Sequence, residues 1–93
     1  MAQPVSFEEF LSIDKSDRRR WSVCLALAIL HVTPKEGWPL IVVEGPAALN
    51  KVVRNFAPQC ELKADDTNRM FRIVRYAVEH PEAELSPAHV EHL

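Results

Sequence analysis

Glycine is almost missing from this chain, since its 93 residues include only Gly37 and Gly45. Loops that hold phosphate groups need several closely spaced glycines, so that backbone N–H groups can approach the ligand. Because the two glycines stand alone, a P-loop and a dinucleotide-binding fingerprint are both excluded. The Gly-x-Ser-x-Gly turn that presents a nucleophilic serine is also missing from the sequence.

Cysteine is scarce as well, and the two that occur, Cys24 and Cys60, lie far apart in the sequence. Cys24 lies within an apolar run, whereas a nucleophilic cysteine needs exposure and a lowered pKa. Nothing around Cys60 favours catalysis. We expect two free thiols, as in a cytoplasmic protein, and no enzymatic activity.

Clustered metal ligands are not evident in the sequence. The histidines of the last segment, His80, His89 and His92, are interrupted by prolines, whereas zinc sites usually have three or four closely spaced ligands. We therefore expect solvated histidines, no metal site and no cofactor.

An excess of positive charge is lacking too, because 11 Lys and Arg residues face 13 Asp and Glu residues, for a net charge of −2. A dedicated nucleic-acid coat protein or a basic peptide of the membrane surface needs a large positive excess. Both classes are excluded by this balance, although a local basic face is not.

No apolar run is long enough to cross a bilayer, which takes about 20 residues. The longest, residues 21–32, follows three arginines, but the acidic residues before them do not fit the basic start of a signal peptide. We expect no membrane association. The same run has no polar stripe, and a helix that is apolar on every side is buried on every side.

The predicted fold is mainly α: a small helical bundle around a buried central helix at about residues 15–33. Further helices are predicted at residues 7–13, 46–57 and 66–79, because apolar residues recur there at helical spacing. The apolar run 40–43 predicts a short strand that pairs, at most, with residues 60–63. We interpret residues 1–93 as one domain, with residues 81–93 as an acidic tail that can be mobile or fold over the arginines. Because the other helices are short, we expect a second copy to complete the burial of the central helix in a homodimer.

The most specific functional feature is a series of arginines at every third position, Arg69, Arg72 and Arg75, beside Tyr76. This series is either a solvated face or a surface for a phosphate backbone or for a partner protein. Arg18, Arg19 and Arg20 are either a solvated, locally paired charge cluster or a docking site for phosphate or for an acidic partner surface. Phe7 and Phe10 are candidates for an exchangeable N-terminal arm. The candidate partner-binding or phosphate-binding residues are Arg69, Arg72, Arg75, Tyr76, Lys51, Arg54, Arg18, Arg19, Arg20, Phe7 and Phe10.

Two functions fit these features. The first is a small non-enzymatic regulator or adaptor that binds another protein. The alternative is a DNA-binding regulator of the winged helix-turn-helix type, with residues 66–79 as the recognition helix and Lys51 and Arg54 on phosphates. Against the alternative, residues 57–65 form a long connection, and the tail lacks the turn residues of a β-hairpin wing.

Overall fold

Helices account for all the regular structure in the described part of the chain. The computed structural model describes residues 14, 16–56, 58 and 61–93. Its elements are α2 (Arg18–Val32), the 3₁₀ helix η1 (Lys35–Gly37), α3 (Trp38–Glu44), α4 (Pro46–Phe56), α5 (Ala64–Glu79) and α6 (Pro87–Val90). The predicted mainly α bundle is confirmed. The helix predicted at residues 7–13 lies outside the described residues.

The helix α2 is the buried helix that its apolar sequence predicts. Asp17 caps its start by accepting a hydrogen bond from the backbone N–H of Arg20 at 3.2 Å. The helix ends at Val32, because Thr33 precedes Pro34 and the residue before a proline is disfavoured in the helical conformation. Every residue from 21 to 30 is buried. A single copy of the chain achieves this burial, so the premise on which we expected a homodimer is not met.

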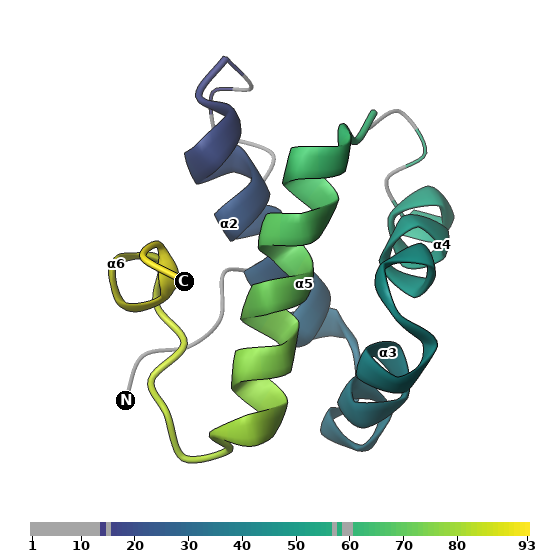
Figure 1. Ribbon diagram of the computed structural model, residues 1–93, viewed down its shortest axis with the longest axis vertical. Coiled ribbons are helices and arrows are strands. Elements are labelled where there is room, and N and C mark those ends of the chain that lie inside the picture. Colours follow the sequence, from purple (N-terminus) through teal and green to yellow (C-terminus); the bar gives the residue numbers. More distant parts are fainter. Residues whose placement is uncertain (1–13, 15, 57, 59–60) are drawn as a thin grey trace.

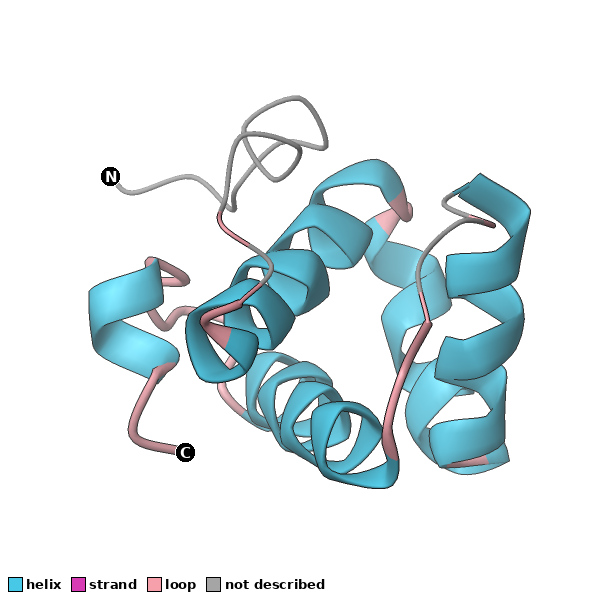
Figure 2. Cartoon of the chain, turned by 90° about the horizontal axis from the view of Figure 1, so that it is seen from above, coloured by secondary structure: helices cyan, strands magenta, loops and turns pink. Residues whose placement is uncertain are grey.

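The helix α5 contacts α2, α3 and α4 and so joins the two sides of the bundle (Figure 1). Its buried residues Met70, Ile73, Val74 and Ala77 recur at the spacing of one helical face. Seen from above, α6 lies at one edge and α3 and α4 lie at the opposite edge (Figure 2). The face of α5 that is not packed against these neighbours is open to solvent.

The strand predicted at residues 40–43 is wrong, because these residues belong to α3. Pro39 suits the first turn of a helix, and Gly45 ends α3 with a φ of 88°, a conformation that favours glycine. Trp38 and Ile41 turn into the core, while Leu40 and Val43 are exposed. Packing of this helical face against α5 therefore outweighs the β-propensity of the branched residues.

The partner strand predicted at residues 60–63 is also wrong where the structure describes it, because residues 61–63 form no regular structure. Cys60 lies outside the described residues. The helix α5 begins at Ala64, slightly before the predicted start. Asp66 lies in its first turn and accepts a hydrogen bond from the backbone N–H of Lys63 at 3.0 Å. The described chain contains no strand to which residues 40–43 could have paired.

The tail folds back on the bundle. Ser86 caps α6 by accepting a hydrogen bond from the backbone N–H of His89, with Pro87 in the first turn. Val90 is buried, and α6 packs against α2. The acidic residues of the tail do not cover the arginines of α5: in the described structure, none of them forms an ion pair with Arg69, Arg72 or Arg75.

Candidate functional site

The three arginines predicted as one series on α5 have different environments. Arg69 is the inward member, with a side chain that is 22% exposed. It donates a hydrogen bond to the Ser22 hydroxyl of α2 at 2.8 Å and lies 3.7 Å from the Asp66 carboxylate. Ser22 in turn donates to the backbone carbonyl of Arg19 at 3.0 Å. Arg69 is thus occupied in holding α5 against α2.

Asp66 is the centre of this polar contact, with a side chain that is only 3% exposed. Its carboxylate forms an ion pair with Arg18 and accepts the hydrogen bond from Lys63. The Arg18 guanidinium also donates to the backbone carbonyl of Glu61 at 3.0 Å and lies 4.2 Å from the centre of the Trp21 ring. We call Arg18, Ser22, Asp66 and Arg69 the α2–α5 polar cluster.

Arg72 and Arg75 have no such role. Both side chains are exposed, and neither forms an ion pair with any described residue. They border a shallow cavity of about 380 Å³ that also touches the end of the tail. We call this cavity the α5 groove; its lining residues are Arg72, Arg75, Tyr76, Glu79, His80 and Leu93.

Aromatic rings form the wall of the α5 groove. The Tyr76 ring packs edge-on against His80, with centroids 4.5 Å apart, and stacks at 6.2 Å on His89 of α6. The Tyr76 hydroxyl lies 3.4 Å from Nε2 of His89. Arg75 lies 6.0 Å from the ring centre of Phe71. These contacts hold Tyr76 between two elements, so the groove has a preformed wall.

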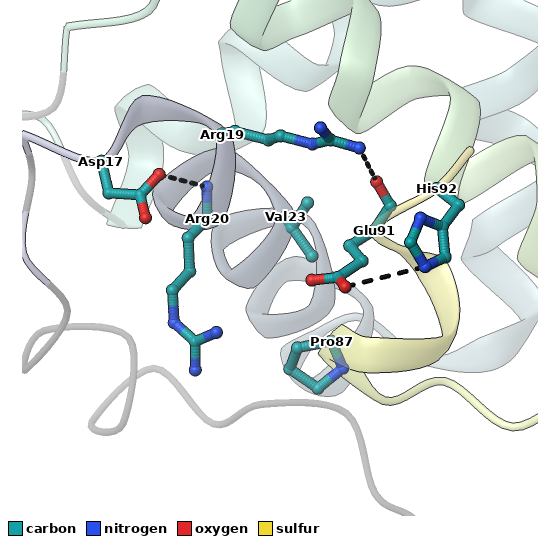
Figure 3. Close-up of a pocket in the computed structure, with 7 residues that line it drawn as sticks. All are labelled: Asp17, Arg19, Arg20, Val23, Pro87, Glu91 and His92. Carbon is teal, nitrogen blue, oxygen red and sulfur yellow. Dashed lines mark hydrogen bonds and ion pairs between the residues drawn. The ribbon is translucent and has the colours of Figure 1, made fainter.

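The second cluster of predicted site residues surrounds the start of α2. Arg19 reaches across to α6 and donates to the backbone carbonyl of Glu91 at 2.8 Å (Figure 3). Arg20 remains exposed and borders a cavity of about 260 Å³. Asp17 and Glu91 line the same cavity, so carboxylates balance its two guanidinium groups. This balance makes it a weaker candidate than the α5 groove.

The other predicted residues do not join the α5 groove. Lys51 and Arg54 are exposed on α4, and Arg54 borders a separate cavity with Glu61. Phe7 and Phe10 lie outside the described residues. Of the predicted candidates, the α5 groove therefore brings together Arg72, Arg75 and Tyr76, while Arg18 and Arg69 meet in the α2–α5 polar cluster.

Sequence reasoning missed His80, His89 and Leu93 as neighbours of Tyr76. The four-residue spacing from Tyr76 to His80 was a usable signal, because such residues are adjacent on a helix. No comparable signal existed for His89 or Leu93, which reach the same region only because the tail folds back.

The chain gives no match to a family model, to a curated protein or to a solved structure. Among the described residues, no three His, Cys, Asp or Glu side chains are grouped so as to hold a metal ion. No helix in the same part of the chain is both long and apolar enough to span a membrane. We therefore infer function from the side chains of the α5 groove.

Proposed function

We propose that this chain is a small, non-enzymatic protein-binding regulator or adaptor, and that its partner docks on the α5 groove. The observation that carries the proposal is the pair of exposed arginines beside a preformed aromatic wall. Arginine and tyrosine are enriched at protein interfaces, because each combines a polar group with a flat apolar surface.

The proposal concerns binding in the cytoplasm and does not need a second copy of the chain. Burial of residues 21–30 within one copy removes the reason for a homodimer. DNA binding by α5 is less well supported, because Arg69 is engaged with Ser22 and Asp66, which leaves two of the three arginines for phosphates. Lys51 and Arg54 belong to another helix and another cavity.

A position-specific photocrosslinking experiment tests the proposal. A photoreactive amino acid replaces Glu79 in one variant of the full chain, because Glu79 lines the groove and its replacement leaves both arginines in place. It replaces exposed Lys51 in the control, and both variants are expressed in the native host cells. We expect a discrete protein adduct from position 79 and none from position 51. Equal labelling at both positions, or no protein adduct at position 79, would contradict the proposal.

A further inference from the structure

We infer that the partner presents a short acidic segment to the α5 groove, with carboxylates on Arg72 and Arg75 and an apolar side chain against Tyr76 and Leu93. The inference rests on the proposed function and specifies the chemistry of its partner. Three features of the groove support it: unused guanidinium groups, a fixed ring beside them, and a carboxylate at one end.

The unused guanidinium groups are the first feature. Residues three apart on a helix are neighbours on its surface, so Arg72 and Arg75 present their charges side by side. Arg18 and Arg69 each have a carboxylate near them, whereas Arg72 and Arg75 have no ion pair in the described chain. A guanidinium binds a carboxylate through two parallel N–H···O bonds, and the groove offers two such groups.

The fixed ring is the second feature. Tyr76 is held between His80 and His89, so binding does not have to order it. Leu93 lies in the same groove with 40% of its surface exposed. An apolar side chain of the partner would therefore find both an aromatic and an aliphatic surface next to the arginines.

The carboxylate at one end is the third feature, and it favours a short peptide over a polyanion. Glu79 lines the groove one turn beyond Arg75, and Glu82 and Glu84 are exposed in the segment that follows. A nucleic acid carries a continuous row of negative charges and would bring phosphates close to these carboxylates. A peptide can place its few carboxylates at Arg72 and Arg75 and turn an uncharged residue toward Glu79.

The test is a fluorescence anisotropy titration of the purified full chain with a short labelled peptide of Glu, Asp and Leu. A length-matched Lys and Leu peptide and a labelled DNA duplex serve as comparison probes. The double variant Arg72→Glu with Arg75→Glu is set against Lys51→Glu with Arg54→Glu, which makes the same change of charge at exposed positions of α4. Circular dichroism melting checks that both variants fold.

We expect the acidic peptide to bind, and the groove variant to bind it more weakly by a factor of at least about ten, since each lost charge-assisted hydrogen bond is substantial. The α4 variant should change the affinity by a factor of no more than about two, because its charges are distant and screened by salt. Glu79→Gln should tighten binding by removing a repulsive charge.

Three results would overturn the inference: no binding of the acidic peptide, equal weakening by the two double variants, or tighter binding of DNA than of the peptide at matched salt. The crosslinking experiment distinguishes a failure of this inference from a failure of the proposed function. A specific protein adduct at position 79 whose crosslinked segment is not acidic would support the docking site and reject its acidic ligand.

Discussion

The two halves of α5 carry the same residue type in opposite roles. In the first half, Arg69 is mostly buried and bonded to α2; in the second half, Arg72 and Arg75 are exposed and have no ion pair in the described chain. The α-helix turns about 100° per residue, so residues three positions apart lie roughly 60° from each other around the helix axis. A series of three such arginines therefore spreads over roughly 120° of the helix surface. Regular spacing alone did not show which member would turn inward.

The largest expected effect comes from breaking the α2–α5 polar cluster at Asp66. Removing one partner leaves the other charge uncompensated, and we expect Asp66→Asn to lower the free energy of unfolding by about 2–4 kcal/mol. The range lies below that of a fully buried pair because Arg18 is 34% exposed. Urea denaturation measures the change, with Asp65→Asn as the matched control at the exposed neighbouring position. Equal effects of the two substitutions would show that the cluster contributes no special stability.

The comparison is sharpened by substituting the arginines one at a time. Arg69→Ala should lower the free energy of unfolding by roughly 1–2 kcal/mol, because it removes a charge-assisted hydrogen bond to Ser22. Arg72→Ala and Arg75→Ala should each change it by less than about 0.5 kcal/mol, as exposed surface substitutions usually do. Urea denaturation of the three variants tests this order. If Arg72→Ala destabilised the chain as much as Arg69→Ala, the proposed division of α5 would be wrong.

A smaller effect is expected at Tyr76, which connects the second half of α5 to the tail. Tyr76→Ala should cost about 1 kcal/mol through the lost contacts with the rings of His80 and His89. Tyr76→Phe keeps the ring and should cost less than about 0.5 kcal/mol, since the hydroxyl contact to His89 is long at 3.4 Å. Amide hydrogen exchange at Val90 measures the loosening of α6. Faster exchange in the Phe variant than in the Ala variant would contradict this division between ring and hydroxyl.

The smallest effect lies outside α5, just before α2. The backbone N–H of Ser16, donated to Asp14 at 2.9 Å, together with the Ser16 side chain, lowers the pKa of the Asp14 carboxyl below its ordinary value of 3.8. Because the folded-state pKa is lowered, the resulting stabilisation is present above that ordinary value and is lost as the pH falls through the folded-state value. Carboxyl-carbon NMR should show Asp14 titrating below 3.8, and Ser16→Ala should raise its pKa only part of the way. A folded-state pKa of 3.8 or above would contradict the prediction.

Much of the fold followed from local patterns, because helix caps and apolar spacing act within a few residues. The start of α4 at Pro46 and the apolar face of α5 could both be predicted from such local patterns. The misassigned strand at residues 40–43 had no such signal: four apolar residues fit a strand or a helical turn equally well. Packing against α5 decided between them, and that contact joins residues far apart in the sequence.

The candidate site could be predicted only in part, because several of its contacts join residues that are far apart in the sequence. Arg72, Arg75 and Tyr76 stood out because they are close together in the sequence. The residues to which Arg18 and Arg69 donate hydrogen bonds lie 43 to 48 residues away in the sequence, so these bonds could not be predicted without the fold. His89 became a neighbour of Tyr76 only through the return of the tail.

The position of Asp66 also has a consequence for the helix dipoles. Arg18 of α2 meets Asp66 of α5, and one turn later Ser22 meets Arg69, so the two helices run in the same direction. Parallel helices bring their partially positive N-termini together, which is an unfavourable alignment unless an anion lies nearby. Each of these ends has its own acidic residue: Asp17 caps α2, and Asp66 lies in the first turn of α5, bonded to Lys63. A carboxylate therefore lies at the positive end of each long helix, and Asp66 also pairs with Arg18 across the two helices.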